Sequence, residues 1–186
     1  MNLKDKVVVI TGGTGGLGKP VTKEYLDAGA KVITTYIVDE EYDDLQSAFA
    51  EKSENLTGYR VNLLSGKEVE EFSNDVAKNF GKVDILVNLA GGFFGGVKLT
   101  DMSEDDWDKM IEINLKTAFL SCKNFLPFMI EQNSGKIINI GSKPGLGGGA
   151  TLSAYSASKA AVINLTQTIA QEVQEHNVNA NVILPS

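Results

Sequence analysis

The chain has 186 residues, 42% of them hydrophobic, which is enough for one globular domain with a sizeable core. Its 24 Asp and Glu against 17 Lys and Arg give a formal net charge of −7, which argues against nucleic acid or an anionic membrane as the main partner. The single cysteine, Cys122, excludes an internal disulfide and any paired-cysteine metal site, so a reducing compartment is the simplest interpretation.

Short apolar runs rich in β-branched residues alternate along the chain with longer helical patterns. The N-terminus leads into the first run after six residues and lacks the pattern of a signal peptide. No apolar segment reaches membrane-spanning length, so we expect a cytoplasmic protein. In chain order, the sequence predicts strands at 7–10, 32–35, 58–61, 83–88, 136–141 and 178–184, and helices at 16–28, 43–51, 67–80, 104–131 and 153–176.

This alternation predicts a three-layer α/β fold with a doubly wound parallel sheet, because strands that are apolar on both faces need helices above and below them. No repeat, low-complexity tract or linker divides the chain, so residues 1–186 are expected to form a single domain. Two glycine-rich segments, 91–96 and 141–149, each follow a predicted strand. Because such sheets bind ligands at the carboxyl ends of their strands, we expect both segments to be loops of a binding site.

A glycine-rich sequence follows the first predicted strand and opens the first helix: Thr11-Gly12-Gly13-Thr14-Gly15-Gly16-Leu17-Gly18. Glycines at such a turn permit positive φ angles and a close approach of the backbone to a ligand. The N-terminus of the following helix offers free N–H groups and a positive dipole end, which suit a pyrophosphate. A turn of this kind can also be purely structural, but its place at the start of a doubly wound fold favours a dinucleotide site.

Residues suited to proton transfer lie between Asn114 and Lys159. Tyr155 and Lys159 are four residues apart on a predicted helix and therefore share a face. A lysine ammonium beside a phenol stabilises the phenolate, so the tyrosine can give a proton to a carbonyl oxygen or take one from an alcohol. Ser142, at the end of the preceding strand, can donate a hydrogen bond to the same oxygen. Each residue alone has a simpler explanation as a surface pair or a loop serine, and the hypothesis depends on their occurring together.

Asn114 falls within an apolar helical stripe, where a buried amide needs specific hydrogen-bond partners. Two interpretations remain open: a structural contact to backbone, or a water chain that leads to Lys159 and resupplies protons. Phe93 and Phe94 either border a substrate pocket or cover the edge of the core. Pro127 is expected to kink or shorten the long helix that contains Asn114.

The other charged features suggest no separate site. The acidic residues within 39–44 are interpreted as a solvent-facing run. His176, the only histidine, is explained by its place near a helix end, where the dipole favours a cation. A lone histidine without neighbouring acids or cysteines is a poor metal ligand, so no metal site is expected.

Taken together, these motifs resemble those of the classical short-chain dehydrogenase/reductase family, over essentially the whole chain. Thr11, Gly12, Gly16 and Gly18 match its TGxxxGxG loop. The segment Asn88-Leu89-Ala90-Gly91 is similar to its NNAG sequence, with Leu89 in place of the second Asn. The catalytic Ser, the YxxxK pair and the helix Asn of the family are matched by Ser142, Tyr155, Lys159 and Asn114.

The resemblance implies a Rossmann fold and hydride transfer between NAD(P)(H) and a carbonyl or secondary alcohol substrate. Tyr155 would act as the acid and base and Ser142 would position the substrate oxygen. Lys159 would hold the nicotinamide ribose, and Asn114 would support the proton relay. The residues implied to contact the dinucleotide are Gly12, Thr14, Gly15, Gly16, Leu17, Gly18, Tyr36, Asn62, Leu63, Asn88, Ala90, Gly91, Tyr155 and Lys159. Reduction of a 3-oxoacyl thioester is a narrower version of this function. The alternative is a non-catalytic dinucleotide-binding protein or an inactive fragment of such a reductase.

The end of the second predicted strand leaves the choice between NAD and NADP open. An acidic residue there would bind the ribose hydroxyls of NAD, and an arginine would accept the phosphate of NADP. Tyr36 takes the usual acidic position, and neither it nor Ile37 is basic. Gly15 is uncharged where many NADP-dependent members have Arg. Lys19 is a candidate phosphate partner, but a solvated helix lysine is the simpler interpretation of it. The lack of a clear cation slightly favours NAD.

The resemblance also implies a homo-oligomer, because the helices at 104–131 and 153–176 usually form the dimer contacts of a tetramer in this family. A homodimer or homotetramer is therefore expected. Members normally continue past the sixth strand with a PG turn, a substrate-covering segment and a seventh strand, whereas this sequence ends at Leu184-Pro185-Ser186. We therefore expect residues 1–186 to be a dinucleotide-binding domain that is incomplete at its C-terminus.

Overall fold

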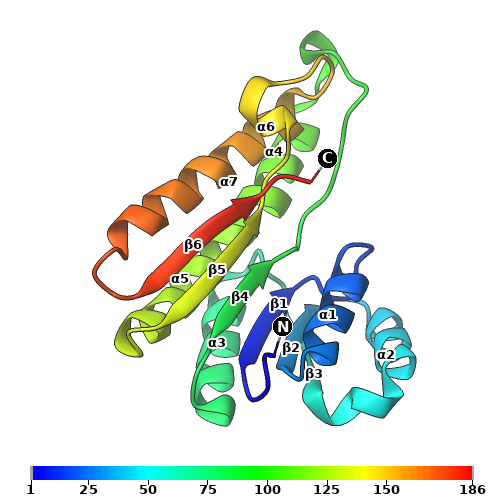
Figure 1. Ribbon diagram of the computed structural model, residues 1–186. Coiled ribbons are helices and arrows are strands. Elements are labelled where there is room, and N and C mark those ends of the chain that lie inside the picture. Colours follow the sequence, from blue (N-terminus) through cyan, green and yellow to red (C-terminus); the bar gives the residue numbers. More distant parts are fainter. Residues whose placement is uncertain (1, 186) are drawn as a thin grey trace.

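Six strands form one parallel sheet, in the order β3-β2-β1-β4-β5-β6, in the computed structural model, which describes residues 2–185 (Figure 1). The strand order reverses between β1 and β4, and in doubly wound sheets this is where a crevice opens at the carboxyl ends. The strands are β1 (Val7–Thr11), β2 (Lys31–Tyr36), β3 (Leu56–Arg60), β4 (Ile85–Asn88), β5 (Gly135–Ile140) and β6 (Val178–Ile183).

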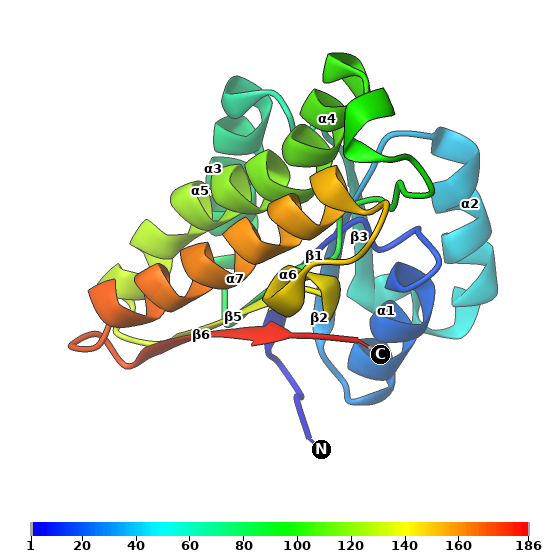
Figure 2. The same cartoon turned by 90° about the horizontal axis from the view of Figure 1, so that it is seen from above.

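Helices cover both faces of the sheet. In Figure 2, α3, α5 and α7 lie over one face, and α1 and α2 lie on the other. The helices are α1 (Gly18–Asp27), α2 (Asp39–Ala48), α3 (Gly66–Phe80), α4 (Glu104–Ile111), α5 (Thr117–Glu131), α6 (Pro144–Gly147) and α7 (Ser153–Glu172). Short 3₁₀ turns, η1 (Ala50–Asn55) and η2 (Leu99–Asp101), and a π-helical turn, η3 (Glu112–Lys116), connect some of them.

Each face of the sheet has its own hydrophobic core. On the α3–α5–α7 side, the rings of Phe72 and Phe125 meet edge to face with centroids 5.4 Å apart, and Phe125 is fully buried. On the α1–α2 side, Leu26 and Leu45 pack against strand residues such as Ile10. Burying one such side chain contributes about 1.5–3 kcal/mol, so the strands between the two cores must be apolar on both faces.

The three-layer parallel fold predicted from the sequence is confirmed, with strand ends displaced by one or two residues. The second helix begins at Asp39, earlier than expected, because the acidic residues of its first turn interact favourably with the helix dipole. The expected end of that helix is instead the turn η1. Helix α7 ends at Glu172 rather than at 176. Ser186, which departs from the family's PG turn, lies outside the described residues.

The long predicted helix at 104–131 is helical throughout but changes type at η3, which the periodicity did not indicate. Pro127 does not shorten it, since α5 continues to Glu131. A proline removes one backbone donor, and burial of Phe125 and Met129 on the same helix offsets that loss.

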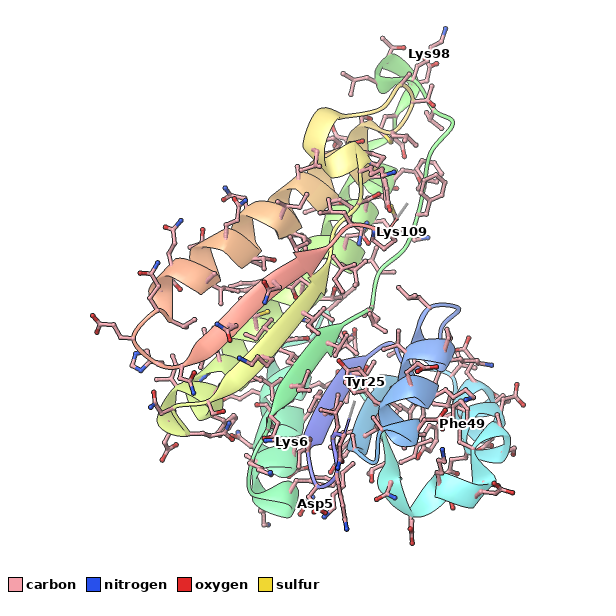
Figure 3. All side chains as sticks on the ribbon, in the orientation of Figure 1. Asp5, Lys6, Tyr25, Phe49, Lys98 and Lys109 are labelled. Carbon is pink, nitrogen blue, oxygen red and sulfur yellow. The ribbon has the colours of Figure 1, made fainter. Side chains whose placement is uncertain are left out.

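The two ends of the sheet differ in what surrounds them. At the amino end, Lys6 forms an ion pair with Asp84, Nζ to Oδ1 2.7 Å. Beyond the carboxyl ends, the chain leaves β4 and runs away from the sheet to η2, and Figure 3 shows Lys98 at the tip of this segment, far from Lys6. The residues predicted to act on ligands lie toward this carboxyl end. Among residues 2–185, we find no helix that combines the length and the apolar character needed to cross a bilayer.

Candidate active site

A cleft of about 600 Å³ opens at the carboxyl ends of β1 to β4. Most of the residues implied to contact a dinucleotide line it, namely Gly12, Thr14, Gly15, Gly16, Leu17, Gly18, Tyr36, Asn62, Leu63, Ala90 and Gly91. Several other residues line the cleft that were not predicted from the sequence, including Glu41, Leu89, Ile113 and Thr117. Ile113 and Thr117 lie close to Asn114 in the sequence, and this proximity could have indicated that they also line the cleft. The cleft therefore joins the glycine loop to the helix that carries Asn114.

Three glycines of the loop, Gly12, Gly13 and Gly18, have no room for a side chain. A Cβ atom at Gly18 would lie 2.2 Å from the carbonyl oxygen of Gly12, and one at Gly12 would lie 3.0 Å from Cα of Ala90. Gly12 also has a φ of +69°, which L side chains rarely adopt. No side chain caps the N-terminus of α1, whose first N–H groups have no acceptor within the helix. The loop thus brings its backbone and the uncapped start of α1 close to the space where a ligand would lie.

Hydroxyls of β2 hold the start of this loop. The N–H of Gly12 donates to Oγ1 of Thr35 at 3.1 Å, and the N–H of Gly13 donates to Oγ1 of Thr34 at 3.0 Å. Both threonines are buried, which explains polar residues in a strand that is otherwise apolar. The strand pattern alone gives no sign that these two threonines position the loop.

Asn88 lies below the cleft rather than in its lining. Its Nδ2 donates to Oδ1 of Asn139 at 2.7 Å, and Nδ2 of Asn139 donates to Oγ1 of Thr166 at 2.9 Å. Cys122 lies in the same buried group, and burial raises the pKa of its thiol to about 12. The network connects β4, β5, α5 and α7, and every amide in it has a partner, as buried polar groups require.

Asn114 is buried in the π-helical turn η3 and joins two segments far apart in the sequence. Its Oδ1 accepts a hydrogen bond from the N–H of Gly92 at 2.9 Å, and its Nδ2 donates to Oγ of Ser158 at 3.1 Å. The backbone contact that the sequence analysis left as one of two interpretations is therefore present. A Cβ atom at Gly91 would lie 2.7 Å from Oδ1 of Asn114 and 3.6 Å from Nζ of Lys159, so Gly91 brings the cleft next to both side chains.

Tyr155 and Lys159 lie on the same face of α7, as their spacing predicts. The Nζ atom of Lys159 is 6.0 Å from the centroid of the Tyr155 ring and donates to the carbonyl oxygen of Ile140 at 2.9 Å. Only 7% of Lys159 is exposed, and this burial lowers the pKa of its ammonium to about 8. Ser142 lies two residues beyond the end of β5 and is also buried. Neither Tyr155 nor Lys159 is part of the lining of the 600 Å³ cleft.

Phe93 contacts the outer side of Tyr155. The two rings meet edge to face, with centroids 4.9 Å apart, and 69% of Phe93 remains exposed. The sequence left two interpretations for this residue, a border of a substrate pocket or a cover over the edge of the core, and the exposure of the ring argues against the second. The exposed ring of Phe93 thus forms an apolar wall beside the Tyr155 side chain.

Comparison with known proteins finds consistent matches. The model of the short chain dehydrogenase family matches residues 6–186. The chain is 36% identical to the 3-oxoacyl-[acyl-carrier-protein] reductase FabG of Thermotoga maritima, over 100% of this chain and 75% of that protein. It is similar in structure to ElxO with NADP bound, with a TM-score of 0.94 and 33% identity over 97% of this chain and 73% of the other.

A second structural match contains the other dinucleotide. NAD+-bound xylitol dehydrogenase superposes with a TM-score of 0.95 and 29% identity, over 100% of this chain and 71% of that one. The chain therefore spans about three quarters of the length of these proteins.

Proposed function

Because this chain belongs to the short chain dehydrogenase family of oxidoreductases, we propose that it transfers a hydride between a nicotinamide dinucleotide and a carbonyl or secondary alcohol carbon. The observation that carries the proposal is the position of Gly91. This residue lines the glycine-loop cleft, and a Cβ atom there would lie 3.6 Å from the Nζ atom of Lys159. A ligand in the cleft would therefore end beside the helix that bears Tyr155.

The cleft fits a dinucleotide in shape and in the donors it offers. The tight turn that Gly12 and Gly18 permit places the uncapped N-terminus of α1 at the cleft, where a pyrophosphate would bind. Asn62 and Leu63 would hold the adenine, and Gly91 with Lys159 would hold the nicotinamide ribose. When bound, the dinucleotide would supply or accept the hydride.

The side chains of this chain would manage the proton. In the direction of reduction, the hydroxyl of Tyr155 donates its proton to the carbonyl oxygen of the substrate, and in oxidation the phenolate takes a proton from the alcohol. The hydroxyl of Ser142 donates a hydrogen bond to the same oxygen. The ammonium of Lys159, held over the ring by Ile140, stabilises the phenolate. Asn114 acts through position, because its amide holds Gly92 and Ser158 on either side of the site.

We propose a 3-oxoacyl thioester as the substrate class, since a relative named for that reaction is 36% identical over the whole of this chain. The exposed ring of Phe93 beside Tyr155 supplies an apolar surface against which an acyl group can pack. The dinucleotide is NAD or NADP, since the similar structure of ElxO contains NADP and that of xylitol dehydrogenase contains NAD+.

Replacement of Tyr155 with phenylalanine tests the mechanism. With an acetoacetyl thioester and NADH or NADPH, loss of the acid should lower turnover by about 100-fold or more, and binding of the reduced dinucleotide should be retained. Turnover is followed by nicotinamide absorbance and binding by nicotinamide fluorescence. Tyr25→Phe is the matched control, because Tyr25 lies on α1, outside the residues that line the cleft (Figure 3).

Two results would contradict the proposal in different ways. Turnover by Tyr155→Phe within tenfold of the unaltered chain would remove Tyr155 from its role as acid and base. Tight dinucleotide binding with no turnover of any carbonyl or alcohol would favour a non-catalytic dinucleotide-binding protein.

We also propose that two copies of the chain associate through α5 and α7. A largely apolar groove of about 370 Å³ runs between these helices, and its lining includes Phe119, Leu126, Ile130 and Leu165. Phe119 is 44% exposed, so a second copy would remove a large apolar side chain from water. Light scattering on a sizing column should give a homodimer or homotetramer, and Phe119→Glu should shift it to the monomer. A monomeric unaltered chain would contradict this assembly.

A further inference from the structure

The end of β2 contributes no charge to the cleft. Tyr36, the last residue of the strand, stacks on Tyr42 of α2 with ring centroids 4.6 Å apart and planes at 3°. Tyr42 is itself held against β3, since a Cβ atom at Gly58 would lie 2.3 Å from its Cε2. The stack thus fixes the first turn of α2 against the sheet, and Tyr36 stands where the family resemblance implies an acidic residue.

Glu41, in the first turn of α2, places a carboxylate at the cleft instead. Its Oε2 accepts a hydrogen bond from Oγ1 of Thr14 in the glycine loop at 2.9 Å. Thr14 is 6% exposed, so this bond ties α2 to a well-packed part of the loop. Glu41 was expected to face solvent with its acidic neighbours. It is solvent-exposed, but it also lines the cleft, and among the described lining residues it is the one that bears a charge.

The nearby cations are directed elsewhere. Arg60, at the end of β3, donates from Nε to the carbonyl oxygen of Ile37 at 3.2 Å and lies 3.7 Å from a carboxylate oxygen of Asp39. Lys19, considered from the sequence as a phosphate partner, is absent from the lining of the cleft. The part of the cleft that is lined by Tyr36, Ile37 and Glu41 therefore has a negative charge, and no cation in the described lining balances it.

We propose that Glu41 sets the choice of dinucleotide in favour of NAD, a step that rests on the proposed function. A carboxylate accepts hydrogen bonds from the two hydroxyls of the adenosine ribose. The same carboxylate repels a phosphate in the place of one hydroxyl. The described lining of the cleft holds no Lys or Arg that could balance the charge of that phosphate. The residue that selects the dinucleotide is then Glu41 on helix α2, five positions after Tyr36, the strand position from which an acidic residue would bind the ribose.

Dinucleotide binding by the intact 186-residue chain and two variants tests this inference. NADH and NADPH are titrated separately against the unaltered chain, Glu41→Gln and Glu40→Gln, and nicotinamide fluorescence gives each Kd. Glutamine keeps the size of the side chain and removes its charge. Glu40 is a matched control, because it is an exposed carboxylate in the same helical turn but does not line the cleft.

The unaltered chain should bind NADH at least tenfold more tightly than NADPH, which corresponds to about 1.4 kcal/mol. Glu41→Gln should reduce this ratio at least threefold, by weakening NADH and strengthening NADPH, and Glu40→Gln should not. A ratio that changes less than threefold in Glu41→Gln, or an unaltered chain that prefers NADPH, overturns the role of Glu41 and leaves the proposed function standing. Binding of neither dinucleotide by the unaltered chain contradicts the proposed function, and the role of Glu41 fails with it.

Discussion

Replacing Lys159 with methionine should change how the stability of the protein depends on pH. The ammonium of Lys159 loses most of its contact with water on folding and gains the carbonyl oxygen of Ile140 as a hydrogen-bond acceptor. Burial lowers the pKa of Lys159 from 10.5 to about 8. In the unfolded chain the side chain therefore binds more protons than in the folded chain between these two values. Stability due to this group is accordingly lowest below about pH 8 and rises as the pH approaches 10.5.

The magnitude follows from the two pKa values. At about 1.36 kcal/mol per pKa unit, the buried charge lowers the free energy of unfolding by about 3 kcal/mol near pH 7. Linkage predicts that about 2 kcal/mol of this is recovered between about pH 7 and about pH 9.5. Methionine has a similar length and no charge, so the Lys159→Met protein lacks this recovery. Loss of the Ile140 hydrogen bond adds an offset of about 1 kcal/mol that does not depend strongly on pH.

Urea unfolding of both proteins at the two pH values measures the effect. The free energy of unfolding of the variant minus that of the unaltered chain should fall by about 2 kcal/mol between pH 7 and pH 9.5. Lys78→Met, which removes an exposed ammonium on α3, controls for the general loss of positive charge from an acidic chain. If the difference for Lys159→Met changed by no more than it does for Lys78→Met, the ammonium would not be desolvated by folding, and the argument from burial would be refuted.

Two further substitutions test the glycine loop and the π-helical turn. Gly18→Ala places a Cβ atom 2.2 Å from the carbonyl oxygen of Gly12, so the loop must move and the affinity for NADH should fall by more than about tenfold, or about 1.4 kcal/mol. Gly66→Ala, which has room for the methyl group on α3, should leave that affinity unchanged, and equal Kd values for the two variants would contradict the steric argument. Thr117→Val removes the hydroxyl that donates to the carbonyl oxygen of Ile113 at 2.7 Å and should lower the free energy of unfolding by about 1–3 kcal/mol in urea. A loss below about 0.5 kcal/mol would mean that this carbonyl finds another donor.

The sheet and the approximate positions of the α-helices were predictable because they depend on local patterns. β1 has five buried residues in succession, Val7–Thr11, and only a strand covered on both faces needs such a run. Tyr155 and Lys159 could be paired because four residues bring side chains to one face of any α-helix. The residues of the glycine loop that line the cleft were predictable for a similar reason, because the loop connects two elements that are neighbours in the sequence, β1 and α1.

The features that were missed depend on contacts between elements distant in the sequence. The side of α2 on which Glu41 faces the cleft is fixed by the stack of Tyr36 on Tyr42 and by the space at Gly58. The periodicity of α2 alone gives an acidic turn, for which a solvent-facing position is the simplest explanation. The family resemblance implied a place for Asn88 in the dinucleotide site, but its amide bonds to Asn139 on β5. A strand alternates its side chains, so adjacent residues such as Asn88 and Leu89 have different environments.

The π-helical turn explains how one amide can serve both halves of the site. In an α-helix the N–H of Thr117 would bond to the carbonyl of Ile113, but here it bonds to Glu112, five residues earlier. The hydroxyl of Thr117 donates to the Ile113 carbonyl instead, so the wider turn does not leave this carbonyl without a donor. Within this turn, Asn114 reaches Gly92 with one end of its amide and Ser158 with the other. Gly92 follows the cleft residue Gly91 and Ser158 precedes Lys159, so a single side chain fixes the spacing between the dinucleotide cleft and the helix that carries the proton donor.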